Sequence, residues 1–544
     1  MTKSDKIILT ASIITAFFLL LLLSVLHDVP LRDVAHRYAP MSEALASGNF
    51  FYAFHPRVLP LHTIFSAAVA FLTGFDGFTA CKFTSCFWYF AGMFILYKLM
   101  QTIYPEDKKI QVLSVALYAI FPYTSQMAYC GLREPIKTFV FLLAALSLVR
   151  IKSDSKNVYN YILLGIAAGF SCIVRSDMIP SACFFLVAGA YFECQNRKFP
   201  IMSILSCIIS QALIIPNICI NYSLFSLAAP DFRFSALFSN YIGKTPDICS
   251  CLLIFAAANI FILQTGWAAE KITRKIKVKY LIFSIAAFTV ISSIAAAAKI
   301  KFDYSTVINF LESVSEGFHS FFGLIVFVYL VIRSKKRKLN SVELILITLV
   351  TVNAFVNIVS IQLYYKQLYV SSRYLHPVLP LLFGFFVCAL RDLYVFIREN
   401  YSPKWAKVFL ACIVVYITGE MIFHTCQPVI RSYTRKKNIV QRKKVLQISK
   451  MIKADYSKCQ NDSAWKFEFD PETYIGYKRP MIYMQGDNKV SAAAYLAGGS
   501  LTFCREKADY IITIGNNEQF RKNLKLVGSV EGYRKTVKLW RVEK

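Results

Sequence analysis

Charged residues are scarce in this chain. Only 17% of its 544 residues are Asp, Glu, Lys or Arg, whereas charged residues make up about a quarter of a typical soluble domain. The hydrophobic share is 56%, and runs of about twenty apolar residues recur, which is the length that a helix needs to cross a bilayer. This composition excludes a set of soluble domains and predicts an integral membrane protein.

The sequence also lacks the signals of several soluble functions. Its net charge is +29, but the basic residues lie in short clusters between apolar runs, so we expect no nucleic-acid partner. The fifteen cysteines form no CxxC pair or zinc-binding spacing, and the chain has no glycine-rich nucleotide fingerprint. Only Cys459 and Cys504 fall in a predicted soluble region, where the sequence leaves their pairing open.

The apolar runs predict an α-helical polytopic membrane protein with about thirteen transmembrane helices. We place them at 7–26, 81–103, 110–128, 136–150, 159–174, 179–193, 201–222, 248–268, 279–299, 319–333, 341–362, 376–396 and 407–424. The first run resembles a signal peptide but has no small-residue cleavage site, which favours an uncleaved helix.

Basic residues predict the orientation of these helices. With the N-terminus in the cytoplasm, every loop assigned to that side carries lysine or arginine, as the positive-inside rule requires. These loops are 105–109, 150–156, 193–198, 270–279, 333–338 and 398–407. We therefore expect a multi-pass protein of the bacterial cytoplasmic (inner) membrane, with the lipid bilayer as a partner and the C-terminus outside.

The outer side is predicted to carry the longer loops, 27–80, 223–247, 300–318 and 363–375. Within the first of them, the apolar stretch Thr63–Thr73 is too short to span and is expected to lie along the interface or re-enter. All seven histidines fall on this side: 27, 36, 55, 62, 319, 376 and 424. An interfacial preference of histidine and an external polar cavity both explain this distribution.

The long apolar runs stop near residue 427. We divide the chain into a transmembrane domain, 1–426, and an outer α/β domain, 427–544, which is long enough for one small domain. A helix is expected over 431–453, and strands over Met481–Met484, Tyr510–Ile514 and Lys535–Arg541. The surplus of basic residues suits either contact with anionic lipid head groups or a solvated surface.

Ionisable residues gather on the predicted outer side, where they can carry chemistry. Asp33, Arg37 and Tyr38 follow the first helix, and Glu134 with Pro135 opens a later helix, whose positive end favours an acid. A carboxylate can accept the proton of an acceptor that attacks a sugar, and arginines can hold the phosphate of a departing lipid phosphate. Other polar residues of this side are His55, Arg57, Arg175, Arg373 and Tyr374.

The order of these residues resembles the C-type (GT-C) glycosyltransferases that use polyprenyl-phosphate sugars, such as protein O-mannosyltransferases and aminoarabinose transferases. The similar segments are Asp33-Val34-Ala35-His36-Arg37-Tyr38-Ala39, Gly48-Asn49-Phe50, His55-Pro56-Arg57-Val58-Leu59, Glu134-Pro135-Ile136, the glycine-rich helix Gly165 to Gly169 ending at Arg175, and Arg373-Tyr374 with Pro377 and Pro380. The chain departs from that pattern at Val34, where the family often has a second acid, and at Phe54-His55, where aminoarabinose transferases have Glu-Lys.

The resemblance implies a glycosyltransferase with Asp33 and Glu134 as catalytic acids. It also implies a polyprenyl-phosphate-linked sugar donor, a glycan, lipid or protein acceptor, an inverting reaction, and a divalent metal cofactor with Glu134 and His55 as candidate ligands. The residues implied for binding the lipid phosphate and sugar are Arg37, Tyr38, His55, Arg57, Arg175, Arg373 and Tyr374.

Structural roles remain open for the same residues. Asp33 could cap a helix or pair with Arg37, and Glu134 could pair with Arg133 and cap its helix. Arg175 and Arg373 could be interfacial anchors, and Gly165 and Gly169 favour close helix packing over chemistry. At the level of the whole protein, a transporter or flippase for a lipid-linked glycan, and a glycan polymerase or ligase, are the alternative functions.

Overall fold

The computed structural model describes residues 2–49, 60–175, 178–196, 199–228, 248–275, 320–336, 342–343, 345–351, 353, 376–459, 465–466, 477–478, 480–484, 492–502, 508–514, 524–531 and 536–542. The helix predicted at 279–299 and most of the one at 341–362 lie outside these residues. The loops 300–318 and 363–375 and most of 223–247 also lie outside them.

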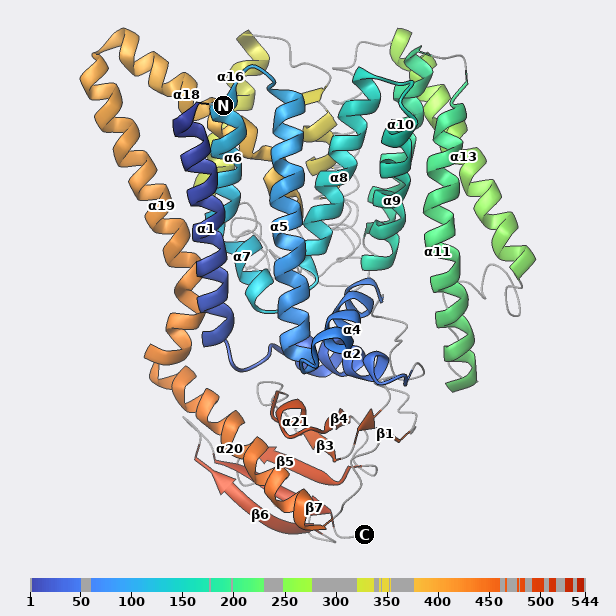
Figure 1. The fold of residues 1–544 in the computed structure, drawn as a ribbon, viewed down its shortest axis with the longest axis vertical. Coiled ribbons are helices and arrows are strands. Elements are labelled where there is room, and N and C mark those ends of the chain that lie inside the picture. The colour runs from blue at the N-terminus through green and yellow to red at the C-terminus, as the bar shows by residue number, and fades with distance from the viewer. Residues whose placement is uncertain are drawn as a thin grey trace, which may run out of the picture.

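A bundle of membrane helices makes up most of the molecule (Figure 1). Its helices are α1 (Lys3–Leu26), α5 (Gly77–Ile103), α6 (Lys108–Ile120), α7 (Pro122–Tyr129), α8 (Glu134–Ser153), α9 (Val158–Val174), α10 (Ile179–Asn196), α11 (Ile201–Ala228), α13 (Ile248–Lys275), α16 (Ser320–Lys336), η4 (His376–Leu382), α18 (Phe383–Asn400) and α19 (Pro403–Thr434).

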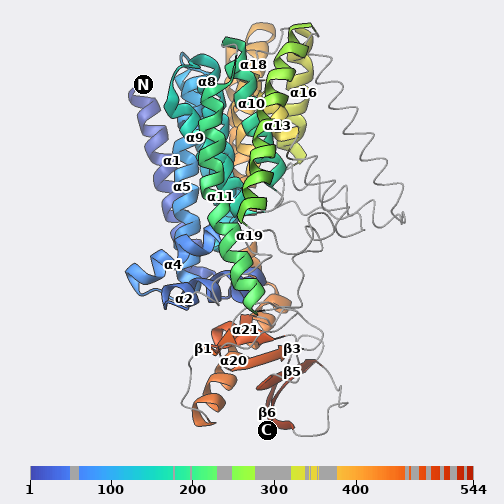
Figure 2. The ribbon, with the colours of Figure 1, turned by 90° about the vertical axis from the view of Figure 1, so that its right-hand side faces the viewer.

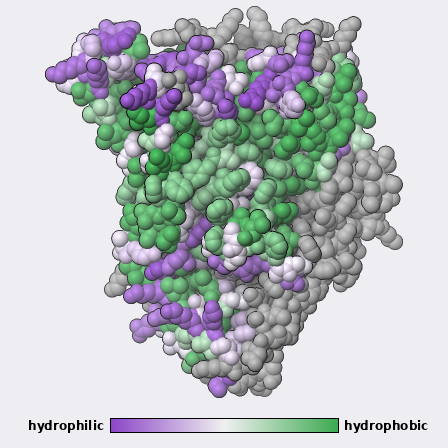
Figure 3. All heavy atoms as spheres, viewed as in Figure 1, coloured by the Kyte–Doolittle hydropathy of each residue, from purple (hydrophilic) through white to green (hydrophobic). Residues whose placement is uncertain are grey.

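The surface of this bundle is suited to a bilayer. Within the described residues, four helical stretches are both long and apolar enough to span one: Lys3–Leu26, Gly77–Ile103, Pro377–Asn400 and Pro403–Thr434. On the face shown in Figure 3, a broad hydrophobic belt crosses the bundle between two more hydrophilic bands. The predicted polytopic helical membrane protein is confirmed, while the count of thirteen spans stays a prediction.

Two predicted helices are interrupted by proline. The helix expected over 110–128 is two helices, because Phe121 is extended, with φ −68° and ψ 120°. Proline at 122 disfavours helical geometry at the residue before it, so the chain turns there and α7 begins anew. The helix expected over 376–396 begins as the tighter 3-10 helix η4, which contains Pro380. A proline lacks the N–H that an α-helix needs at that point.

Helix α8 is the centre of the bundle. It packs against α5, α9, α10 and η4, and most of its residues are buried. Close helix packing continues outward from α9 to α11, because a Cβ on Gly165 would lie 2.7 Å from the backbone oxygen of Ser206. A Cβ on Gly169 would likewise lie 2.7 Å from Leu213. The packing role predicted for these two glycines is confirmed.

Three short helices lie across one end of the bundle, next to the C-terminal sheet (Figure 2). They are the π-helix η1 (Val34–Tyr38), α2 (Ala39–Ala46) and α4 (Leu61–Thr73). We call this end the domain end. The stretch 63–73 is thus confirmed as a transverse helix, which ends where Gly74 adopts φ 72°.

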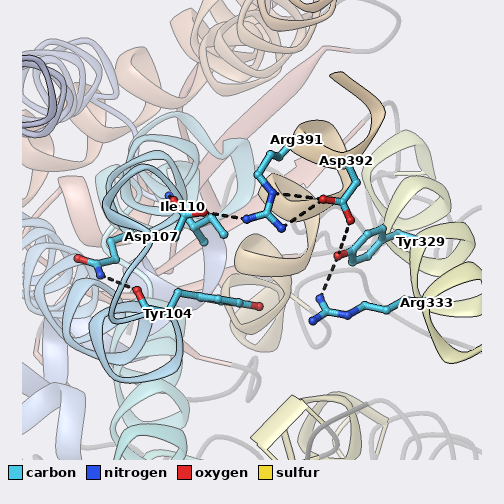
Figure 4. A network of polar contacts seen from close by, with 8 residues as sticks. Tyr104, Asp107, Ile110, Tyr329, Arg333, Arg391 and Asp392 are labelled. Atoms are coloured by element: carbon cyan, nitrogen blue, oxygen red, sulfur yellow. Dashed lines mark hydrogen bonds and ion pairs between the residues drawn. The ribbon is translucent and has the colours of Figure 1, made fainter. Parts of the chain in front are cut away.

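The opposite end of the bundle holds the N-terminus and the α5–α6 and α18–α19 connections (Figure 1). A polar network joins helices there (Figure 4). Arg391 donates to Asp107 over 2.8 Å and to Asp392 over 3.2 Å, and Asp392 accepts from Tyr329 over 3.4 Å. Arg333 donates to the Tyr329 hydroxyl over 2.9 Å. The network connects the start of α6 with α16 and α18, so it fixes the helix arrangement far from the domain end.

The C-terminal part begins with α20 (Lys436–Cys459). Its five-stranded sheet has the order β4-β3-β5-β7-β6, in which β4, β3 and β5 are parallel and β7 is antiparallel to β5 and β6. The strands are β3 (Met481–Met484), β4 (Ser500–Thr502), β5 (Tyr510–Ile514), β6 (Leu524–Val530) and β7 (Val537–Val542), with a short pair β1 (Trp465–Lys466) and β2 (Tyr477–Lys478) beside them. The predicted strands at 481–484 and 510–514 match β3 and β5, and the one at 535–541 overlaps β7, whereas β1, β2, β4 and β6 were not predicted.

The core of this part forms between α20 and the sheet. Val445, Ile448 and Ile452 of the helix share one buried cluster with Ile482 and Leu539 of the strands. The helix predicted over 431–453 is interrupted in the structure, because α19 runs through the predicted domain boundary at 426–427 and ends at Thr434. Cys504 lies outside the described residues, so its pairing with Cys459 stays a prediction.

Polar contacts dock the C-terminal part onto the domain end. The guanidinium of Arg442 on α20 forms a two-point ion pair with Asp28, just after α1. From the short helix α21 (Ala492–Leu496), the Tyr495 hydroxyl donates to Glu43 over 2.6 Å and accepts from the backbone N–H of Phe78 over 2.9 Å. The first loop therefore lies between the bundle and the sheet.

Substituting Gly77 tests the close approach of α5 to α2. A Cβ at Gly77 would overlap with the backbone oxygen of Ala39, and the backbone cannot move aside as a side chain can. We expect Gly77→Ala to destabilise the protein by about 1–3 kcal/mol through overpacking, measured as a lower midpoint of thermal unfolding in detergent. Gly419, in α19, has nothing within 4 Å of its Cβ position, so Gly419→Ala is the control and should not lower the midpoint. Equal effects of the two variants would contradict the close approach.

Candidate functional site

Four segments that are distant in sequence meet at the domain end. They are η1, the first turn of α4, the first turn of α8 and the residue that ends α9. The link between the last two is an ion pair, in which Arg175 donates from Nη1 to Glu134 Oε1 over 3.2 Å. Both side chains are buried, with 9% and 3% of their surface exposed. The structure thus brings together two predicted site residues that lie 41 positions apart.

The local sequence explains why Glu134 lies at this point. Gly131 adopts φ 76°, a left-handed conformation that suits glycine, and the chain turns there before α8. Glu134 and Pro135 then form the first turn of α8. Proline has no N–H to satisfy in that turn, and a carboxylate is stabilised by the positive end of the helix. The open alternative for Glu134 was pairing with Arg133, and the structure shows it paired with Arg175.

Arg133 makes a second bridge between α8 and α9. Its Nη1 donates to the backbone oxygen of Val174 over 3.1 Å. Its guanidinium also lies over the ring of Tyr38, 5.5 Å from the ring centroid, which is within the range of a cation–π contact. Arg133 therefore links the last residue of η1 with the ends of α8 and α9.

His62, in the first turn of α4, completes the buried part of the site. Its ring lies nearly perpendicular to that of Tyr38, with 5.5 Å between the centroids. Its Nε2 lies 3.2 Å from the backbone oxygen of Gly131. Burial lowers the pKa of His62 to about 4, although the hydrogen bond to Gly131 acts in the opposite direction. The ring is therefore neutral near pH 7.

The hydrogen bond of His62 determines its tautomer. A carbonyl oxygen only accepts, so the neutral ring carries its proton on Nε2 and donates it to Gly131. The other nitrogen, Nδ1, is left as an acceptor. It is buried and forms no hydrogen bond with the part of the chain that the structure describes.

Asp33, Arg37 and their neighbours lie on η1. Asp33 precedes this π-helix and is partly buried, and its side chain makes no capping hydrogen bond. The structure thus does not support a side-chain cap as the role of Asp33. His36 and Tyr38 are buried and Arg37 is partly exposed. Single-turn π-helices are frequent at functional sites.

Four predicted site residues fall outside the described residues: His55, Arg57, Arg373 and Tyr374. His55 is one of the two expected metal ligands. In the described ranges no three His, Cys, Asp or Glu side chains lie close enough to hold a metal ion. The other expected ligand, Glu134, is paired with Arg175, whose positive charge would oppose a cation at the same carboxylate. The divalent metal that the motifs imply, with Glu134 and His55 as ligands, therefore stays a prediction.

The site also contains residues that sequence reasoning did not select. His62 was counted among the outer histidines but not assigned to the site, although its place at the start of a non-spanning apolar stretch was a usable signal. Arg133 was considered only as a partner of Glu134. Both are placed by tertiary contacts with Tyr38, which the sequence pattern does not reveal.

Comparison with known proteins identifies the fold. No family model and no curated protein matches the sequence. Among solved structures, the chain is similar to the Archaeoglobus fulgidus oligosaccharyltransferase tethered with an acceptor peptide, with a TM-score of 0.51, 11% identity, and coverage of 91% of this chain and 64% of that one. It therefore spans less than two thirds of that protein.

A second similar structure is ArnT from Cupriavidus metallidurans bound to undecaprenyl phosphate, with a TM-score of 0.40, 9% identity and 97% coverage of both chains. A third is the archaeal oligosaccharyltransferase AglB from Archaeoglobus fulgidus in complex with an inhibitory peptide and a dolichol-phosphate, with a TM-score of 0.42, 9% identity, and coverage of 92% of this chain and 65% of that one. The first of these matches, with a TM-score above 0.5, shows a fold shared with that oligosaccharyltransferase, which agrees with the GT-C-like fold predicted from the motifs.

Breaking the Glu134–Arg175 pair tests its role in the site. Removing one partner leaves the other charge buried, so Glu134→Gln and Arg175→Met should each destabilise the protein by about 3–5 kcal/mol. The double variant carries neither charge and should lose less stability than the two single losses combined, measured by thermal unfolding in detergent. The exposed pair Arg398–Glu399 is the control, and Arg398→Met should cost less than about 1 kcal/mol. Additive losses in the double variant would contradict a direct pair.

The pKa of His62 predicts a pH dependence of stability. Because the pKa is about 4 in the folded protein against a usual 6.5, the unfolded chain binds the proton more readily between these values. Above pH 6.5 the ring is neutral in both states, and this group does not lower the free energy of unfolding. As the pH falls toward 4, the free energy of unfolding decreases by an amount on the order of 3 kcal/mol. His62→Gln should flatten that part of the stability–pH curve. His424→Gln, at a more exposed histidine, should leave the curve unchanged, and an unaltered slope in His62→Gln would refute the assignment.

Proposed function

We propose that this protein is a membrane glycosyltransferase that moves a sugar from a polyprenyl-phosphate donor to an acceptor at the domain end of the bundle. The observation that supports this most is the convergence of Glu134, Arg175, Tyr38 and His62 beside the helix that follows Asp33. Such a site offers carboxylates, a guanidinium and a neutral imidazole at the edge of an apolar belt. A lipid-linked substrate can reach it from the bilayer.

In the proposed reaction, a nucleophilic group of the acceptor attacks the anomeric carbon of the donor sugar. The new glycosidic bond forms as the bond between that carbon and the phosphate oxygen breaks, and the lipid phosphate leaves with the bonding electrons. Asp33 accepts the proton that the acceptor loses. A single displacement of this kind inverts the anomeric configuration.

Arginine side chains supply the binding of the phosphate in this proposal. Arg37 and Arg175 are the described candidates, with Arg57, Arg373, His55 and Tyr374 expected from the motifs. A guanidinium can form two parallel hydrogen bonds to a phosphate and stabilise the charge that develops on the leaving group. Glu134 holds Arg175 in place through the buried ion pair.

The proposal includes an orientation in the membrane. The domain end faces outward, and residues 427–544 form an outer domain attached to the transmembrane part, 1–426. The N-terminus then lies in the cytoplasm of a bacterial cell, on the side of the basic loops. The fold shared with an oligosaccharyltransferase that was tethered to an acceptor peptide supports a protein acceptor, and the motifs leave a glycan or lipid acceptor open.

A transfer assay tests the proposed function. Membranes containing the protein should move sugar from a polyprenyl-phosphate donor to an acceptor, and membranes without it should not. Movement of a lipid-linked glycan across sealed vesicles without transfer would instead indicate a transporter. Use of a diphosphate-linked oligosaccharide alone would indicate a polymerase or ligase. Repeating the assay with a chelator tests the divalent metal that the motifs imply.

Replacing Asp33 by asparagine gives the sharpest test of the mechanism. The substitution keeps the size of the side chain but removes the base, so transfer should fall by about a hundredfold or more. Binding of the donor should persist, because the phosphate is assigned to arginines. The control is Asp154→Asn, an exposed acid at the opposite end of the bundle, which should leave the rate unchanged. Near-full transfer by a normally expressed Asp33→Asn variant would remove Asp33 from the mechanism and direct attention to Glu134.

A further inference from the structure

A cavity of about 1070 Å³ lies between α1 and α5, outside the candidate catalytic site. Both helices pack against α6 and α7, and α1 and α5 stand side by side in front of them (Figure 1). The volume slightly exceeds that of typical small-molecule pockets, which measure about 300–1,000 Å³. The cavity therefore has room for a large occupant, such as a molecule with more than one acyl chain.

The walls of this cavity face the bilayer belt and are apolar. Phe17 and Leu21 of α1 line one side, and Phe83 and Phe87 of α5 line the other. Each has more than half of its surface exposed, so the cavity is a groove that opens toward the hydrocarbon. In a membrane, such a surface contacts the acyl chains of lipids.

The end of the groove at the domain end is polar and is closed by the C-terminal part. Tyr495, Leu496, Gly498 and Gly499 line it from that part, and Glu43 and Asp76 line it from the first loop. The Tyr495 hydroxyl donates to Glu43 over 2.6 Å and lies 3.3 Å from Asp76 Oδ1. Burial raises the pKa of Tyr495 well above its usual value, so this hydroxyl stays protonated and keeps donating.

The two carboxylates accept only from neutral groups in the part of the chain that the structure describes. Glu43 accepts from the backbone N–H of Gly77 over 2.9 Å, and Asp76 accepts from Phe78 and Thr79. No described lysine, arginine or histidine forms an ion pair with either acid. Lys82, which lines the same groove, acts on Asp76 electrostatically without forming an ion pair with it, so the two carboxylates can still meet a second cationic group in the groove.

The other charges at this end have different roles. Asp28 is neutralised by Arg442. Lys82 donates to the backbone oxygens of Ser24 and His27, over 2.7 and 2.6 Å, at the end of α1. Lys453 is exposed and lines the groove from α20. The polar end thus presents a pair of carboxylates and a separate ammonium group.

We propose that this groove binds one zwitterionic, amine-bearing phospholipid from the surrounding bilayer, such as phosphatidylethanolamine. Its acyl chains lie between α1 and α5, its ammonium group meets Glu43 and Asp76, and its phosphate faces Lys453. A lipid that carries no amine would leave the carboxylate pair without a cation. The site goes beyond the proposed transfer reaction, and it places a bilayer lipid at the contact between the bundle and the C-terminal part.

Native mass spectrometry of the purified full-length protein tests the head-group assignment. The protein is equilibrated with mixed micelles that contain equal amounts of phosphatidylethanolamine and phosphatidylglycerol, and the retained lipid is counted. Wild type should retain the ethanolamine lipid preferentially. Glu43→Gln with Asp76→Asn should reduce that preference by about tenfold or more, because charged hydrogen bonds are lost. Tyr495→Phe removes the docking hydroxyl but keeps both charges, so its preference should persist.

A second pair of variants tests the apolar part and does not depend on the acids. Leu21 lines the groove and Leu22 does not, although both are more than half exposed on α1. Leu21→Trp should fill the groove and lower the amount of retained lipid, whereas Leu22→Trp should not. Equal retention of the two head groups by wild type, an unchanged preference in the double acid variant, or equal effects at positions 21 and 22 would each overturn the proposal.

Discussion

The ion pair between Glu134 and Arg175 is the interaction on which the domain end of this protein depends. It joins the first residue of the central helix α8 to the residue that ends α9. Because both groups are buried, neither can exchange its partner for water, and the two helix ends are held in one arrangement. Arg133 and His62 then bind to backbone oxygens of the same two turns. Tyr38 packs against both side chains, so η1 with Asp33 and Arg37 is positioned by the same cluster.

Helix α5 separates two sites of different character. On the side of α8, the chain presents the buried ion pair of Glu134 and Arg175, with Tyr38 and His62 beside it. On the side of α1, it presents an apolar groove with carboxylates at one end. Both sites use the loop after α1, which supplies Tyr38 to the first and Glu43 to the second. The C-terminal part packs against this loop through Tyr495 and Arg442. A shift of that part relative to the bundle would therefore move residues of both sites.

Much of the architecture could be predicted from local patterns. Helix positions follow from runs of apolar residues, since a chain in hydrocarbon must satisfy its backbone hydrogen bonds within each segment. Strands β3 and β5 were placed correctly because their residues are apolar and β-branched or aromatic between polar neighbours. The break at Phe121 was missed although Pro122 gives its cause, because the apolar run continues across it. Strand β6 was not predicted because Lys525 and Gly528 weaken its pattern, and its pairing with β7 decides the outcome.

The sequence by itself determined the membrane class, the short non-spanning stretch at 63–73, and the ionisable residues that gather at one end of the bundle. These properties depend on composition and on spacing along the chain, so they can be predicted without knowledge of tertiary contacts. Only the tertiary structure decided which of those residues meet. Arg175 rather than Arg133 was found paired with Glu134, His62 joined Tyr38, and Tyr495 reached Glu43 across 452 positions. Such contacts are set by how helices pack in three dimensions, and no periodicity in the chain encodes them.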